Sequence, residues 1–121
     1  MRPLLLNAAR AFAMVAFSDG RLTPIEAKRF VSICAHDPAF ANFGHADIAD
    51  AWTQASNEVH AAQSFGTALV TIRTEITDPK EKTTIMRVAQ TATIADGKLE
   101  PQENVAVSAL AEALGLDPKN Y

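Results

Sequence analysis

The chain has 121 residues, of which 11 are Lys or Arg and 14 are Asp or Glu, so its formal net charge is −3 at pH 7. This length fits one domain, expected to span residues 1–121, and the lack of a basic excess argues against nucleic acid as a partner. The single cysteine, Cys34, excludes an internal disulfide and a thiol-based metal cluster within the chain.

The first segment, residues 1–17, superficially resembles a signal peptide, because Arg2 precedes a run of leucines and alanines. Arg10 interrupts the apolar stretch, however, and Asp19 with Gly20 stand where small cleavage-site residues would be expected. We therefore expect a helix of a mature, cytoplasmic protein. No other apolar run approaches the roughly 20 residues needed to cross a bilayer, so no membrane span is expected.

Prolines indicate where helices begin, because a proline at the first helical position lacks an N–H that would have no partner there. The segments Thr23–Glu26 and Asp78–Glu81 each contain a capping side chain, a proline, and a glutamate three residues after the cap. This is the capping-box pattern. Glu100–Glu103 is a weaker copy, and Asp37-Pro38 supplies only the cap and the proline.

Apolar spacing between these positions is mostly helical. Residues 65, 69, 72 and 76 are apolar and fit one face of a helix, whereas the β-branched alternation of residues 70–77 also fits a strand. A lone strand would have nothing to pair with, so a helix is the prediction. The last helix should end at Gly115, followed by Leu116. The fold class is therefore all-α, with about six or seven helices.

An octapeptide occurs twice. Asp19–Glu26 (DGRLTPIE) recurs as Asp96–Glu103 (DGKLEPQE), with five of eight positions identical. Each copy follows a helix with an arginine at the matching place, Arg10 or Arg87, and precedes another helix, so two similar helix-turn-helix units flank a central helical insert. Each arginine is expected either to extend past its apolar neighbours to solvent or to pair with octapeptide carboxylates.

The octapeptides have two interpretations. Any helix corner favours a glycine, a leucine anchor, a cap and a glutamate, so capping alone explains the pattern. Alternatively, the acids bind a divalent cation. Calcium takes about six to eight oxygen ligands, so the two carboxylates of one copy are too few, and two copies together would supply four. The EF-hand spacing is absent. The candidate metal ligands are Asp19, Glu26, Asp96 and Glu103.

These features together resemble the TerB family of tellurite-resistance-associated proteins. The resemblance rests on Phe17–Gly20 after the first helix, on Ile94–Gly97 after a later helix, and on Leu114–Leu116 at the end of the last helix. It covers the chain from about Ala8 to Tyr121. Two copies of the acidic turn with matching flanking helices make it moderately specific.

The resemblance implies an all-helical, non-enzymatic bacterial protein of the cytoplasm, with an acidic surface that binds metal cations. It also implies a link to the tellurite or stress response and to protein complexes near the membrane. Related modules precede the J-domain of a membrane-anchored co-chaperone. The family's acidic positions correspond to the four candidate ligands named above. Ser18 and Lys98 depart from the family pattern, which lowers the expected affinity for a cation.

Other sites are less consistent with the sequence. Cys34, His36 and His45 could be imagined as zinc ligands, but their spacing matches no standard finger. We instead expect His36 near a helix C-terminus and Cys34 as a buried thiol. The aromatic residues are expected in the core rather than in a ligand cage.

Three functions remain to be compared. The preferred one is a helical module whose acidic turns bind a cation. The second is a protein-interaction or scaffold domain, with an unidentified protein partner, in which the acids only cap helices. A carboxylate-dependent hydrolase is disfavoured, because no nucleophile or general base accompanies the acids. The two octapeptides hold five acids and two bases and so carry the whole net charge of the chain.

Overall fold

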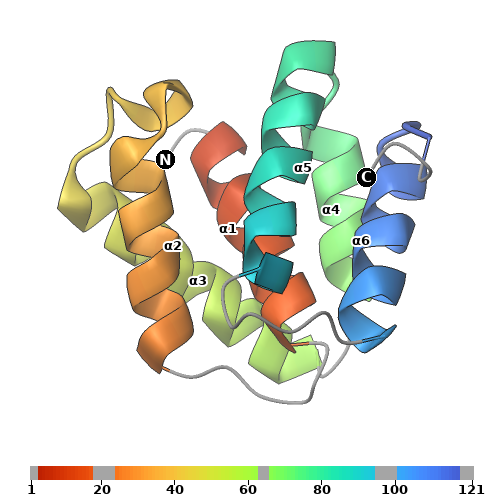
Figure 1. Cartoon of the computed structure of the whole chain (residues 1–121), viewed down its shortest axis with the longest axis horizontal. Coiled ribbons are helices and arrows are strands. Elements are labelled where there is room, and N and C mark those ends of the chain that lie inside the picture. The colour runs from red at the N-terminus through yellow and green to blue at the C-terminus, as the bar shows by residue number, and fades with distance from the viewer. Residues whose placement is uncertain (1–2, 18–23, 63–65, 95–100, 118–121) are drawn as a thin grey trace.

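The computed structural model describes residues 3–17, 24–62, 66–94 and 101–117, with backbone only for residues 93–94 and 101–103. Throughout these ranges the secondary structure is helical, with no strand, which confirms the predicted all-α fold (Figure 1). The helices in chain order are α1 (Pro3–Ala16), α2 (Pro24–His36), the 3-10 helix η2 (Pro38–Phe40), α3 (His45–Ala62), α4 (Gly66–Glu75), α5 (Pro79–Ile94) and α6 (Pro101–Ala113).

The α-helices alternate in direction along the chain, and α1 lies in the middle of the bundle (Figure 1). Helix α1 packs most extensively against α5 and α3, and it also contacts α4 and α6. Leu5 and every residue from Asn7 to Val15 are buried, so α1 is enclosed on all sides. This explains its nearly uniform apolar sequence, since a helix with one solvent face would show a polar stripe.

Aromatic side chains form part of the core, as predicted. Phe12 lies edge-on to both Phe30 and Trp52, with ring centroids 5.6 Å apart in each case, and Phe30 and Trp52 are 5.4 Å apart. Such pairs contribute about 0.5–1.5 kcal/mol each beyond the burial of their area. The cluster joins α1, α2 and α3.

Two of the predicted aspartate caps are observed. The Oδ1 atom of Asp37 accepts a hydrogen bond from the N–H of Ala39 at 2.9 Å, and Asp78 Oδ1 accepts one from Lys80 at 2.8 Å. Each aspartate precedes a proline that occupies the first position of its helix. The sequence pattern therefore located these helix starts correctly.

The segment that allowed either a helix or a strand is helix α4. Ile72 and Ile76 are buried, whereas Val70 is 54% exposed, so the core takes the residues spaced for a helix. The end of α6 also agrees with the prediction. Gly115 has a φ of 75°, and Leu116 donates its N–H to the carbonyl of Ala111 at 2.8 Å. Together with the bond from Gly115 to Glu112, this is the Schellman arrangement.

Candidate functional site

The predicted cation ligands fall mostly outside the described part of the chain. Asp19 and Asp96 lie outside it altogether, and Glu103 lies in α6, but its side chain is not described. Glu26 is in the first turn of α2 and is half-buried. Among the described residues, no group of three or more His, Cys, Asp or Glu side chains could hold a metal ion. The four-carboxylate site therefore stays a prediction.

The helix ends that flank the two octapeptides lie at one end of the bundle. Helices α1 and α5 run in the same direction and pack side by side, so their C-terminal ends lie together (Figure 1). The N-terminal ends of α2 and α6 are at this same end, which is the lower one in the view. The leading helices of the two repeated units are thus direct neighbours, a relation that the sequence repeat did not specify.

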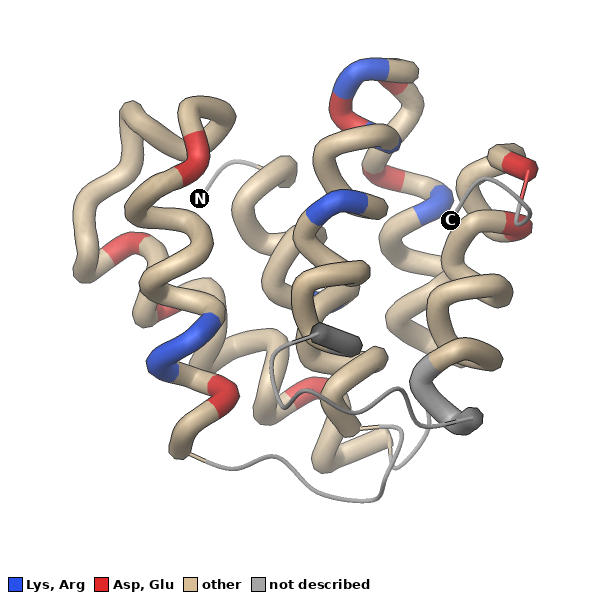
Figure 2. The backbone as a smooth tube through the Cα atoms, in the orientation of Figure 1, with Lys and Arg blue, Asp and Glu red and all other residues tan. Residues whose placement is uncertain are grey.

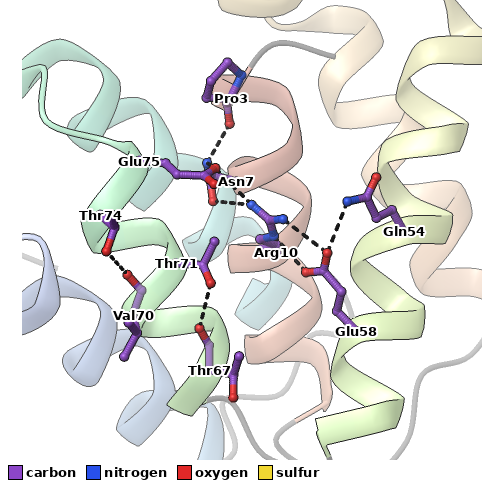
Figure 3. A network of polar contacts seen from close by, with 10 residues as sticks. All are labelled: Pro3, Asn7, Arg10, Gln54, Glu58, Thr67, Val70, Thr71, Thr74 and Glu75. Atoms are coloured by element: carbon purple, nitrogen blue, oxygen red, sulfur yellow. Dashed lines mark hydrogen bonds and ion pairs between the residues drawn. The ribbon is translucent and has the colours of Figure 1, made fainter.

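A polar network is centred on Arg10 of α1, whose side chain is only 8% exposed (Figure 3). Its Nε donates to Glu58 Oε1 at 2.8 Å and its Nη2 to Glu58 Oε2 at 3.1 Å. Its Nη1 donates to Glu75 Oε1 at 3.1 Å and to Asn7 Oδ1 at 3.0 Å. Asn7, fully buried, donates in turn to Glu75 Oε1 at 2.8 Å. The network connects α1 to α3 and α4.

The electrostatics favour the charged forms of Arg10 and Glu58. Burial by itself lowers the pKa of Arg10, but the hydrogen bonds and negative charges of Glu58 and Glu75 outweigh it, and the net pKa is raised. The hydrogen bond from Arg10 lowers the pKa of Glu58, against the opposing effect of burial. A guanidinium bonded to two carboxylates meets the requirement that a buried charge be paired and hydrogen-bonded.

A cleft of about 440 Å³ between α3 and α4 includes Arg10 and Glu58 in its lining, with apolar walls from Val59, Ala62 and Ala68. Both oxygens of Glu58 already accept hydrogen bonds from Arg10, and Oε2 accepts a further one from Gln54. The arrangement suits holding three helices together better than binding or transforming a ligand. Nothing in the sequence around Glu58 or Glu75 indicated this role. The one signal was Arg10, a charged residue within the apolar first helix.

The second repeated arginine also finds a carboxylate. Arg87 of α5 donates two hydrogen bonds from Nη2 and one from Nε to the carboxylate of Asp37, at 2.9–3.1 Å. Both arginines were expected to reach solvent or to pair with octapeptide acids. The partners observed among the described residues, Glu58, Glu75 and Asp37, all lie outside the octapeptides.

Cys34 is buried at the end of α2, as expected. Burial, and secondarily the negative charge of Asp37, raises the pKa of its thiol to about 12. The thiolate is therefore scarce near neutral pH, and the residue is not suited to act as a nucleophile. His36 is the last residue of α2, which agrees with its predicted place at a helix C-terminus. Its Nδ1 atom lies 2.7 Å from the carbonyl oxygen of Ser32.

Comparison with protein families decides the assignment. The family model described as tellurite resistance protein TerB matches residues 5–121. The chain belongs to the TerB family. No curated protein and no solved structure matches it.

The TerB match extends over both octapeptides, the central insert and all of α1 except its first two residues. The resemblance found in the sequence is thereby confirmed over essentially the whole chain, together with the all-helical fold. The TerB helices described here include none that is long and apolar enough to cross a membrane.

Proposed function

We propose that this TerB-family protein is a non-enzymatic helical module of the tellurite or stress response, and that its two acidic turns together bind one divalent cation. The ligands are Asp19, Glu26, Asp96 and Glu103. The observation that carries the proposal is that the helix ends flanking both octapeptides lie at one end of the bundle. A cytoplasmic location and a protein partner, in a complex near the membrane, complete the proposal.

The chemistry of the cation explains why both turns are needed. Calcium takes about six to eight oxygens and magnesium about six, which two carboxylates cannot supply. Four carboxylates leave only a few coordination positions of the cation for backbone carbonyls and water. The parallel packing of α1 and α5 supports this arrangement, because both octapeptides then follow helix ends that are neighbours.

Calorimetric titration of the metal-free protein with Ca²⁺, Mg²⁺ and Zn²⁺, together with ¹⁵N NMR, tests this proposal. One shared site predicts that Asp19→Asn and Asp96→Asn each weaken the same binding event. Asp50→Asn, an exposed aspartate of α3 outside the octapeptides, is the matched control and should leave binding unchanged. The metal proposal is wrong if no cation perturbs the amides of the four proposed ligands.

The second candidate is a protein-interaction or scaffold domain, including a co-chaperone-type module, in which the acids only cap helices. It is supported by the observed caps at Asp37 and Asp78, because Thr23 and Glu100 hold the same place before a proline in the octapeptides. Here Asp19→Ala and Asp96→Ala should each lower the free energy of unfolding by roughly 1 kcal/mol and leave partner binding intact. Lost binding at unchanged stability would count against capping alone.

A further inference from the structure

Helices α4 and α6 carry exposed apolar side chains on a shared surface. The two helices pack against each other and run in the same direction on the right of Figure 1. Val70 of α4 is 54% exposed and Val105 of α6 is 61% exposed, and among the described residues only Ile25 of α2 is another exposed large hydrophobic residue. We call this surface the α4–α6 face and define it by Val70, Arg73, Thr74, Val105, Ser108 and Glu112.

Helical spacing places the members of this face on one side of each helix. On α4, Arg73 follows Val70 by three residues, and both are exposed. On α6, Glu112 follows Val105 by seven residues, which is about two turns, and both are exposed too. Each helix therefore contributes an apolar side chain followed by a charged one.

The middle of both helices carries no charge. Residues 66–72 of α4 and 104–111 of α6 contain no Asp, Glu, Lys or Arg, and Figure 2 shows the charged positions on the described parts of these helices near their upper ends. Thr74, beside Val70, donates its hydroxyl to the carbonyl of Val70 at 2.8 Å. Because this hydrogen bond lies within the helix, covering Thr74 would leave no hydroxyl donor unpaired.

The two charges of the face have opposite signs. Arg73 lies in the last turn of α4, and Glu112 lies in the last turn of α6, so both are near the C-terminal ends of adjacent parallel helices. Among the described contacts, neither side chain forms an ion pair or a hydrogen bond. A two-fold axis parallel to the helices would place α4 of one copy opposite α6 of another, so that Arg73 meets Glu112 twice.

We propose that the α4–α6 face binds the same face of a second copy of the chain in a two-fold symmetric dimer. Val70 and Val105 pack across its centre, and two Arg73–Glu112 ion pairs lie at its edge, as is usual for an apolar interface with a polar rim. A second copy suits this face because it brings both signs of charge in matching places, whereas a wholly acidic or basic partner would meet a like charge.

Sedimentation equilibrium from about 10 µM to about 1 mM protein tests the dimer. The native chain should show a reversible monomer–dimer equilibrium. Val70→Ser and Val105→Ser should each weaken it by about tenfold or more, because two-fold symmetry removes each valine twice from the interface. Ile25→Ser is the matched control, since Ile25 is also 61% exposed but lies on α2, and it should have no effect.

Charge reversal tests the pairing itself. Arg73→Glu and Glu112→Arg should each weaken the dimer by about tenfold or more, because each creates two like-charge contacts. The double variant should recover association, and so should an equimolar mixture of the two single variants. Lys28→Glu on α2 reverses a charge outside the face and should have no effect. Circular dichroism confirms that each variant is folded.

Three results would overturn the proposal. These are a monomer up to about 1 mM, equal losses from the valine variants and Ile25→Ser, or a double charge variant that associates no better than either single variant. The cation proposal would be unaffected by any of them, because Arg73 and Glu112 lie at the end of the bundle opposite the helix ends that flank the octapeptides. Calcium titration of the same variants should accordingly match the native protein.

Discussion

Arg10 and Arg87 occupy the same place in the two repeated units, each nine residues before the aspartate of its octapeptide. Their surroundings are opposite. Arg10 is 8% exposed and pairs with carboxylates that are 42% and 40% exposed, whereas Arg87 is 51% exposed and pairs with Asp37, whose side chain is 10% exposed. In the first unit the buried member of the ion pair is the arginine, and in the second it is the carboxylate.

The difference originates in the central insert. Helices α3 and α4 cover α1 and supply Glu58 and Glu75, so the arginine of the first unit meets its carboxylates inside the bundle. Arg87 instead reaches from α5 to Asp37 at the start of η2. A repeated residue thus acquires its role from the helices that pack around it. The two arginines should accordingly contribute unequally to the free energy of unfolding.

Arg10→Met should have the largest effect, a loss of about 3 kcal/mol in the free energy of unfolding. Removing one partner of a buried ion pair costs about 3–5 kcal/mol, and the half-exposed glutamates place this case at the lower end. Fully buried Asn7 would also lose the Nη1 donor of Arg10. Urea unfolding measures the change, and a loss below about 1 kcal/mol would show that the network is not structural.

Asp37→Ala should rank second, with a loss of about 2 kcal/mol. The variant removes both the cap on Ala39 and the pairing with Arg87, each worth about 1 kcal/mol. Asp78→Ala is the matched control, because Asp78 makes the same Asp-Pro cap with no arginine partner among the described contacts, and it should cost about 1 kcal/mol. Equal losses in the two variants would mean that Arg87 contributes nothing.

Arg87→Met should cost about 1 kcal/mol or less, because the guanidinium is half exposed and Asp37 keeps its hydrogen bond from Ala39. A double-mutant cycle with Asp37→Ala isolates the pair. If Arg87→Met were as damaging as Arg10→Met, the contrast between buried and exposed arginine would be wrong.

The smallest effect is expected from acid titration of Glu58. Arg10 lowers the pKa of Glu58 in the folded state, so the unfolded state binds the proton more readily. The stabilisation is present above the ordinary value of 4.5 and is lost as the pH falls through the lowered value. Stability curves of the native protein and Glu58→Gln, measured between pH 7 and pH 3, should therefore converge toward acid. Curves that stay parallel would contradict this.

Local sequence signals predicted most of the fold. Asp37 and Asp78 before prolines located helix starts, and Gly115 located a helix end. Each of these features is set by neighbours within one or two turns. Helix α4 was decided differently, because a lone strand in this segment would have had nothing to pair with. The family resemblance followed from the same local patterns repeated in order.

Such local signals could not predict which side chains far apart in the sequence would pair. Glu58 and Glu75 are separated from Arg10 by 48 and 65 residues, and nothing in their own neighbourhoods distinguishes them from other surface acids. The cleft between α3 and α4 depends in the same way on how two helices pack. The acidic octapeptides, in contrast, were identified by their repetition, and their role as a cation site stays a prediction.

The enclosure of α1 has a consequence for synthesis. Helix α1 is synthesised before the helices that cover it and is apolar except for Asn7 and Arg10, and its largest partner, α5, is not complete until Ile94 has been added. At about 5–20 residues per second, α1 waits several seconds for its cover. Nascent chains ending before Pro79 should accordingly remain open to protease and prone to aggregation, and chains that extend past α6 should not. The central helix of the finished bundle is thus the most vulnerable helix of the growing one.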